Sequence, residues 1–213
     1  MRPPLRIPYL TPERLRAEAD AFLDQTHPSR SLPIPVEQMI ERLGLDIVPI
    51  PGLQQAFDMV GCTNSDMTCI YVDQSVAEFR ESRYRFTLAH EIAHVRLHPQ
   101  IFGNLRHAAS TAHEWQAFIR GIPDVLYGSM EWQANVFAGL VLMPPTHLKR
   151  EYARLAGGIR KMMNDPALAG VPKGQIADMA WDELVTRLAP SFSVSEEVVR
   201  RRLDFDGFKP EGL

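Results

Sequence analysis

The segment His90-Glu91-Ile92-Ala93-His94 holds the residues whose types and spacing point most directly to chemistry. On an α-helix, residues four apart lie on one face, so the imidazoles of His90 and His94 can bind a single metal ion. Glu91 lies about 100° around the helix from His90, where its carboxylate can reach a water on that ion without binding the ion. This pattern predicts a hydrolytic site with one Zn²⁺ per chain, His90 and His94 as ligands, and Glu91 as general base.

A packing role is the alternative for the two histidines, because isolated histidines usually lie on a helix face with hydrogen-bonded nitrogens. The chain contains 7 histidines in 213 residues. A shuffled chain of this composition would contain the pattern with a probability of about 1.5%. Chance is therefore a weak explanation. A third ligand would further weaken the packing explanation, since a catalytic zinc site needs three protein ligands and one open position.

The residues directly after His94 exclude one source of that third ligand. The extended pattern of the metzincin class requires glycine and histidine where this chain has Leu97 and Gln100. His98 immediately precedes Pro99 and lies about 80° around the helix from the first histidine of the pair. We therefore expect His98 to support a ligand or to cap the helix C-terminus, and not to bind the ion.

A carboxylate on a separate helix is the other source of a third ligand. The segment "SMEWQANVFAGLVLMPP" contains Glu131, and Asn135 follows four residues later on the same helix face. The Asn135 amide is positioned to hydrogen-bond a ligating histidine. Gln133 carries no charge, so Glu131 is the one carboxylate that this segment offers. The alternative for Glu131 is structural: a glutamate in a first helical turn is favoured by the helix dipole.

Two helices must hold these residues. The first is predicted over 77–97 and is ended by Pro99. The second is predicted to begin with Ser129 as its N-cap and to end at Pro144-Pro145. A long mixed connection lies between them, with a helix expected around 110–120.

The chain before these helices alternates between helical and extended patterns. Thr11 is predicted to cap a helix over 12–25, and a short helix in "VEQMIERLG" is predicted to end at Gly44. Residues 45–72 contain three short runs rich in β-branched or aromatic residues, which predict a small antiparallel or mixed sheet. The fold class is therefore α+β, with a mostly helical C-terminal part.

The C-terminal region from 176 predicts two helices joined by a short linker, with Ser193 as N-cap of the second helix. This is the outline of a helix-turn-helix, and it raises a second class of function: a DNA-binding or partner-binding regulator with a structural or sensory metal site. The region carries five basic and eight acidic side chains, and only Arg200, Arg201 and Arg202 cluster. Direct nucleic-acid binding by this helix pair is therefore disfavoured.

Composition sets wider limits. The chain is 45% hydrophobic and 23% charged, which is typical of a globular protein, and its net charge of −3 gives no general attraction to nucleic acid or anionic membranes. The longest apolar run, 136–143, is too short to span a bilayer, and the N-terminus lacks a signal-peptide core. Cys62 and Cys69 are expected to be free thiols. These features predict a cytoplasmic protein with no membrane partner.

The segments "RFTLAHEIAHVRLH" and "EWQANVFAGLVLMP" resemble those of the ImmA/IrrE metallo-endopeptidases, a bacterial and phage family with a zincin-like core. The resemblance covers about residues 34–147 and, more loosely, the C-terminal tail. It implies that His90, His94 and Glu131 bind Zn²⁺, that Glu91 is the general base, and that Asn135 supports a ligand. It also implies a protein substrate, a transcriptional repressor or antitoxin-like regulator.

The chain departs from the family pattern at two places. Many relatives carry a second glutamate at the position of Gln133, and the spacer between His94 and Glu131 is longer than expected. A role in a toxin–antitoxin or phage-immunity pair, in which partner binding matters as much as cleavage, also stays open.

We expect three regions: an N-terminal arm and helix over 1–30, a zincin-like metallopeptidase core over 31–150, and a helical region with the helix-turn-helix-like pair over 151–213. A donor for the developing oxyanion is also needed. The sequence leaves five candidates for it: His98, His107, His113, Tyr127 and His147.

Overall fold

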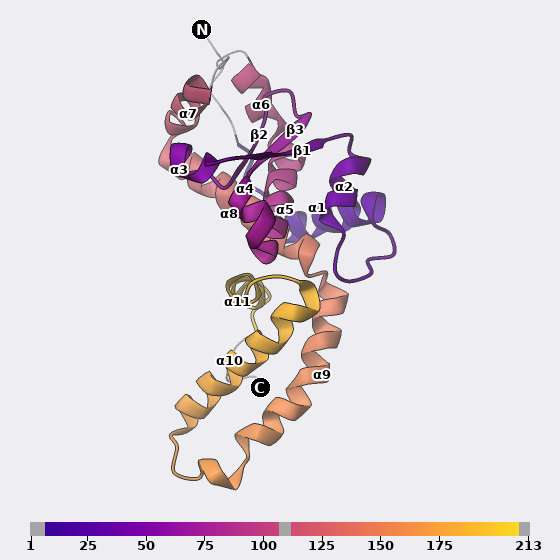
Figure 1. Cartoon of the computed structure of the whole chain (residues 1–213). Helices are drawn as coiled ribbons and strands as arrows, with labels where there is room; N and C mark the ends of the chain where they lie inside the picture. The colour runs from indigo at the N-terminus through magenta and orange to yellow at the C-terminus, as the bar shows by residue number, and fades with distance from the viewer. Residues whose placement is uncertain (1–6, 107–111, 209–213) are drawn as a thin grey trace.

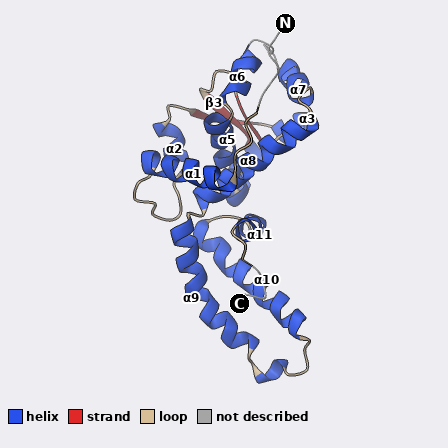
Figure 2. Cartoon of the chain, turned by 180° about the vertical axis from the view of Figure 1, so that it is seen from behind, coloured by secondary structure: helices blue, strands red, loops and turns tan. Residues whose placement is uncertain are grey.

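The computed structural model describes residues 7–106 and 112–208, which form a body of helices and one small sheet with a long helical hairpin projecting from it (Figure 1). The body contains, in chain order, α1 (Pro12–Thr26), α2 (Val36–Arg42), β1 (Asp46–Ile50), α3 (Leu53–Phe57), β2 (Gly61–Thr63), β3 (Cys69–Asp73), α4 (Gln74–Phe79), α5 (Glu81–Leu97), α6 (Pro99–Arg106), α7 (Ala112–Arg120) and α8 (Asp124–Leu142). The C-terminal part contains α9 (Pro145–Met163), the 3₁₀ turn η1 (Pro166–Leu168), α10 (Lys173–Phe192) and α11 (Glu196–Phe205). Helices dominate both parts, and the strands are confined to the body (Figure 2). The predicted α+β class is confirmed.

The N-terminal helix forms as its capping residues predict. The Thr11 side chain accepts a hydrogen bond from the backbone N–H of Arg14, and Pro12 occupies the first helical position. One face of α1, which includes Leu15, Phe22 and Leu23, is buried against α8. The second predicted helix, α2, ends as expected before Gly44, whose φ of +71° lies in the left-handed region.

The sheet has the order β1-β3-β2. β1 pairs with β3 in parallel and β2 pairs with β3 antiparallel, so the sheet is mixed. The middle of the three runs expected as strands is "AFDMVGC", 56–62, but 53–57 form α3, and the strand begins only at Gly61. This short helix lies in the connection that carries the chain from β1 to β2 on the far side of β3. The chain then reverses from β2 into β3, so β1 and β3 run parallel.

The segment from His90 to His94 lies in a helix that is shorter than predicted. Arg80 has non-helical backbone angles (φ −135°, ψ 62°), so the expected helix over 77–97 is divided into α4 and α5. Asp73 caps α4 by accepting a hydrogen bond from the backbone N–H of Ser75. The buried face of α5 includes Leu88 and Ile92 and packs mainly on α8.

The second site helix begins earlier than predicted. α8 starts at Asp124 after Pro123, so Gly128 and Ser129 lie inside the helix and the prediction of Ser129 as N-cap is wrong. The Ser129 hydroxyl accepts a side-chain hydrogen bond from Gln133 and does not cap the helix. Glu131 is therefore about two turns from the helix start, beyond the reach of the terminal dipole.

The connection between the site helices holds α6 and α7, and α7 matches the helix expected around 110–120. Beyond α8, α9 and α10 form an antiparallel hairpin, and α11 packs on α10 and α8 (Figure 1). Ser193 adopts left-handed angles (φ +51°) and ends α10, whereas Ser195 accepts a hydrogen bond from the backbone N–H of Val198 and caps α11. The N-cap prediction was thus wrong by two residues.

Within the described residues, no helix combines the length and the apolar character needed to cross a bilayer.

Candidate metal centre

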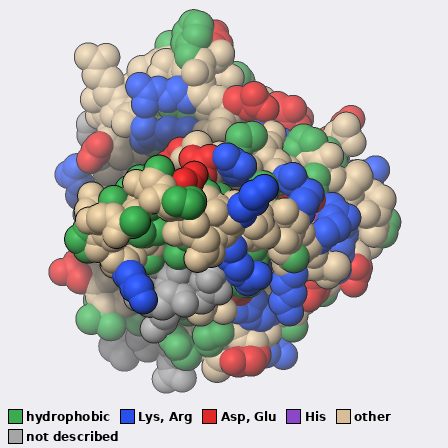
Figure 3. All heavy atoms as spheres, turned by 90° about the horizontal axis from the view of Figure 1, so that it is seen from below, with side chains coloured by type: hydrophobic (Ala, Val, Ile, Leu, Met, Phe, Trp, Pro, Cys, Tyr) green, Lys and Arg blue, Asp and Glu red, His purple; other side chains and the backbone are tan. Residues whose placement is uncertain are grey.

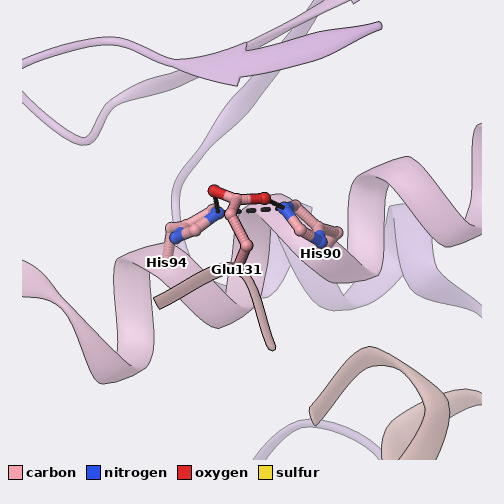
Figure 4. Close-up of side chains that lie close together, drawn as sticks. All are labelled: His90, His94 and Glu131. Atoms are coloured by element: carbon pink, nitrogen blue, oxygen red, sulfur yellow. Dashed lines mark hydrogen bonds and ion pairs between the residues drawn. The ribbon is translucent and has the colours of Figure 1, made fainter. Parts of the chain in front are cut away.

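Three potential ligands meet between α5 and α8 (Figure 4). The Nε2 atoms of His90 and His94 lie 2.9 Å apart. The Glu131 carboxylate projects from α8, with Oε2 3.3 Å from His90 Nε2 and Oε1 3.5 Å from His94 Nε2. Among the described residues, this is the only group of three or more His, Cys, Asp or Glu whose ligand atoms all lie within 4.8 Å of one another.

Small side chains allow the two helices to approach closely. Ala89 and Ala93 on α5 are buried, as are Ala134 and Ala138 on α8. The distance between packed helices depends on the side chains at their contact, and alanine permits a short one. A carboxylate on one helix can therefore reach the imidazoles on the other.

Asn135 determines which nitrogen of His90 carries a proton. Its Oδ1 lies 3.1 Å from His90 Nδ1. A carbonyl oxygen can only accept, so Nδ1–H must donate. In the neutral imidazole, the lone pair is then on Nε2, which faces Glu131.

A longer chain of hydrogen bonds fixes His94. The side-chain amide of Gln133 donates through Nε2 to the backbone carbonyl of Pro8 at 3.1 Å and to the Ser129 hydroxyl at 3.2 Å. Its Oε1 therefore accepts from His98 Nε2–H at 3.4 Å. The other nitrogen of neutral His98 then accepts from His94 Nδ1–H at 3.2 Å, which leaves the lone pair of His94 on Nε2. When both rings are neutral, each therefore presents an unprotonated Nε2 to Glu131.

Electrostatics favour a cation between these groups. Burial, with His90 and His98 close by, holds the pKa of His94 well below its usual value. Burial also lowers the pKa of His98 to about 4. Burial acts to lower the pKa of His90 as well, but the hydrogen bond to Glu131 and the charges of Glu91 and Glu131 outweigh it, so this pKa is raised. Two imidazole lone pairs and a carboxylate face one another, and this donor set fits a divalent cation such as Zn²⁺.

Glu91 lies beside this centre and points toward β2. It is 7% exposed, and its Oε2 accepts a hydrogen bond from the Thr63 hydroxyl at 3.0 Å. Burial raises the pKa of Glu91, and the negative charge of Glu131 adds to this, against the opposing effects of His90 and Thr63. A carboxylate with a raised pKa is a stronger base, and so a more effective proton acceptor.

The strand β2 reaches Glu91 because position 61 is glycine. A Cβ at Gly61 would lie 2.5 Å from Thr87 Cγ2 and 3.6 Å from Glu91 Cγ. A larger residue would therefore push the strand, and Thr63 with it, away from α5. The sequence shows this glycine at the start of a short extended run but gives no sign of the contact.

The centre opens into a cavity of about 510 Å³. Its wall is mixed. The apolar part is formed by Phe57, Met59, Val60, Phe86, Ile101, Phe102, Ile119 and Met130, and the polar part away from the candidate ligands includes Asp58, Arg83, Gln116 and Arg120. Cys62 also lines it, and burial together with the nearby charge of Glu91 raises the pKa of this thiol to about 12. Cys62 and Cys69 are both free, as predicted, and Cys62 is held in the protonated form.

The five candidates for the oxyanion donor differ in whether they line this cavity. Tyr127 lines the cavity, and burial together with the charges of Glu131 and Glu91 raises the pKa of its hydroxyl, which stays protonated. His98 lies behind His94, and His147 does not line the cavity. His107 lies outside the described residues, and so does the side chain of His113.

The structure thus brings together the site residues that the sequence singled out, His90, Glu91, His94, Glu131 and Asn135, with His98 directly behind them. Sequence reasoning did not assign roles to Thr63, Gly61 or the Gln133–Pro8 contact, because these depend on packing between distant segments. The departure of Gln133 from the family pattern was the one signal that pointed to its position.

A model of the IrrE N-terminal-like domain, peptidase family M78, matches residues 40–204. The search of curated proteins gave no match. The matched range contains the whole of α5 and α8, and with them the three candidate ligands and Glu91. It continues through α9 and α10 and ends one residue before the end of α11. Because the match covers well over half of the chain, the chain belongs to the IrrE N-terminal-like family of metallopeptidases.

Proposed function

We propose that this protein is a zinc endopeptidase in which His90, His94 and Glu131 bind the metal and Glu91 is the general base. The convergence of three ligand atoms beside an open cavity carries the proposal. Structural zinc sites use four protein ligands, whereas catalytic sites use three and leave a position free. The three-ligand set and its open side therefore favour hydrolysis over the alternative of a regulator with a structural or sensory metal.

Each residue has a defined task in this proposal. Zinc bound here would supply Lewis acidity and lower the pKa of its bound water from about 15.7 toward about 7. Glu91 takes the proton of the attacking water on its carboxylate and passes it to the leaving amine. Thr63 holds that carboxylate in position. Tyr127 donates its hydroxyl hydrogen bond to the developing oxyanion.

We propose a protein substrate, of the repressor or antitoxin-like class that the family resemblance implies. The cavity is bordered by β2, whose outer side pairs with no other strand among the described residues and could take an extended peptide as a further strand. We place the protein in the cytoplasm, in agreement with its two free thiols.

Substrate trapping tests this function. The Glu91→Gln variant is expected to retain the uncleaved partner during purification from the source cells, whereas the native chain is expected to yield the same partner as shorter fragments. Mass spectrometry of both preparations identifies the partner and the cleaved bond. A partner that stays intact with the active, zinc-loaded chain would favour the binding-only alternative.

A further inference from the structure

The exposed side of α9 is strongly basic. The helix carries five basic residues, Lys149, Arg150, Arg154, Arg160 and Lys161, and all five are exposed. Glu151 is its only acidic residue. This concentration of positive charge stands out because the chain as a whole has a net charge of −3.

Most of this charge is not neutralised within the described structure. Arg150 and Arg154 share one partner, Glu151, at 3.4 Å and 2.8 Å. Lys149, Arg160 and Lys161 form no ion pair with any residue that the structure describes. The helix therefore presents a positive field to solvent.

The arginine cluster of α11 is different. Arg200 pairs with Asp182 at 3.0 Å, and Arg201 pairs with Glu197 at 2.6 Å. Arg202 is 3% exposed and pairs with Asp206. These three arginines of the helix-turn-helix-like pair thus form ion pairs with acidic side chains, whereas α9 carries positive charge without ion-pair partners among the described residues.

The chemistry of α9 favours nucleic acid over a protein partner. Its apolar side chains, which include Leu148, Leu155 and Ile159, are buried in the hairpin core, and α9 has no large exposed hydrophobic residue. Protein interfaces depend on buried aromatic and aliphatic anchors and are poor in lysine, whereas nucleic-acid interfaces are polar and positively charged. Burial of the apolar face also argues against insertion of α9 into a lipid surface.

The position of the helix allows a long ligand to reach it. The α9–α10 hairpin projects from the body, and α9 forms one side of it (Figure 1). Viewed from below, lysine and arginine side chains gather toward the side on which α9 runs (Figure 3). Lys149 and Lys161 are twelve residues apart, or about 18 Å along the axis, a length that spans several phosphates of a duplex.

We infer that the basic face of α9 binds the phosphate backbone of duplex DNA, without sequence specificity. Contacts of lysine and arginine with phosphate carry no sequence information by themselves. Such a surface would hold the protein near a DNA-bound protein. This inference does not depend on the proposed peptidase activity.

Fluorescence anisotropy with a labelled duplex of about 25 base pairs and arbitrary sequence tests the inference. We expect the full chain to bind with a dissociation constant of about 10⁻⁴ to 10⁻⁶ M at physiological salt, and the logarithm of the binding constant to fall linearly with the logarithm of salt concentration. The triple variant Lys149→Gln, Arg160→Gln, Lys161→Gln removes three cations. It should bind more weakly and lower the magnitude of the salt slope by about 2.7.

Two control variants make the result specific. Arg200→Gln combined with Arg201→Gln removes charge from α11 and should leave the affinity within about twofold of the native value, since both arginines are already paired. Glu91→Gln should bind DNA as the native chain does. Circular dichroism checks the fold of each variant, and the single variant Lys161→Gln, with an expected change in slope of about 0.9, serves if the triple variant unfolds.

Three outcomes would overturn the inference. One is absence of DNA binding at about 50 mM salt, where this interaction is strongest. Another is an unchanged salt slope in folded α9 variants. The third is binding to vesicles rich in phosphatidylserine or to a polyglutamate peptide with no binding to DNA, which would assign α9 to a membrane or to an acidic protein.

Discussion

At the scale of single residues, Glu91 and the two histidines beside it have separable roles. Glu91 lies beside the ligand atoms and is held by Thr63, so Glu91→Gln should keep its place and its hydrogen bond while losing basicity. We expect the variant to keep one zinc per chain and to lose about 10²- to 10⁴-fold in peptide hydrolysis. Elemental analysis and a cleavage assay measure the two effects. Loss of zinc from the variant would show that Glu91 is a ligand.

Glu131 can be tested against a second glutamate in the spacer. Glu131→Ala removes the only carboxylate among the three converging groups, so we expect zinc affinity to fall by more than the 10- to 100-fold typical of lost supporting contacts. Glu114, exposed on α7, is the matched control, and Glu114→Ala should leave zinc affinity unchanged. Competition with a chromophoric chelator gives both values. The reverse ranking would move the third ligand to α7.

Gln133 should act on zinc through His98 and His94. Gln133→Leu removes the oxygen that accepts from His98 Nε2–H, so the proton on His98 is free to move and the lone pair of His94 is no longer directed to Nε2. We expect a 10- to 100-fold loss of zinc affinity, measured by chelator competition. Gln133→Glu keeps an oxygen that can accept from His98 Nε2–H, and glutamate is the residue that many relatives carry here. This variant should therefore retain most of the native zinc affinity. Equal affinities for the Leu and Glu variants would show that Gln133 has no part in setting His94.

The relative placement of the candidate site residues could be predicted from the sequence where it depended on one helix. The spacing places His90 and His94 on one face and Glu91 about 100° around from His90, whatever surrounds the helix. Glu131 was harder, because its structural alternative relied on a helix start at Ser129, and the structure removes that alternative by starting α8 at Asp124. The Pro8–Gln133 contact joins residues 125 positions apart, and no local pattern encodes it.

At the scale of elements, the approach of β2 to α5 decides whether Thr63 reaches Glu91. Gly61→Ala would place a Cβ 2.5 Å from Thr87 Cγ2. We expect this overpacking to lower the free energy of unfolding by about 1–3 kcal/mol and to reduce hydrolysis, because Thr63 moves away from the Glu91 carboxylate. Denaturant unfolding and the cleavage assay measure the change.

Gly128 provides the matched control for Gly61. It lies within α8, and a Cβ there would meet no atom within 4 Å. Gly128→Ala should therefore leave the free energy of unfolding unchanged or raise it by up to about 1 kcal/mol. If Gly61→Ala proved as stable as Gly128→Ala, β2 would be free to move relative to α5 and could not position Thr63.

The elements differed from prediction where tertiary packing overrode local signals. Pro123 starts α8 more than a turn before Ser129, which is a good N-cap residue, and Arg80 interrupts a continuous helical pattern. α3 takes up Ala56 and Phe57, which were expected to begin the middle strand, so that strand starts only at Gly61. The ends of helices and strands thus depend on the balance between local sequence signals and tertiary packing. Helix α1, which has a strong N-cap in Thr11, begins where the sequence predicted.

At the scale of the whole molecule, α11 joins the hairpin to the body through a buried charge cluster. Arg202 and Asp206 pair with each other, and Asp206 also pairs with Arg16 of α1 at 2.6 Å. The Arg202 side chain packs beside Gly139 of α8, where an added Cβ would lie 3.5 Å from Arg202 Cδ, an ordinary contact distance. The family match likewise extends from the site helices through the hairpin.

Arg202→Met should therefore weaken the attachment of the hairpin while leaving the metal centre intact. The variant keeps most of the volume but leaves Asp206 buried with Arg16 as its remaining partner, so we expect the free energy of unfolding to fall by about 3 kcal/mol. Arg200→Met, at an exposed ion pair on the same helix, should change it by less than about 0.5 kcal/mol. Denaturant unfolding gives both values, and limited proteolysis should cut Arg202→Met first between α9 and α11. If zinc content fell in step with proteolysis of the hairpin, the candidate metal centre would depend on the hairpin for its structure. That result would contradict the expectation that the centre stays intact.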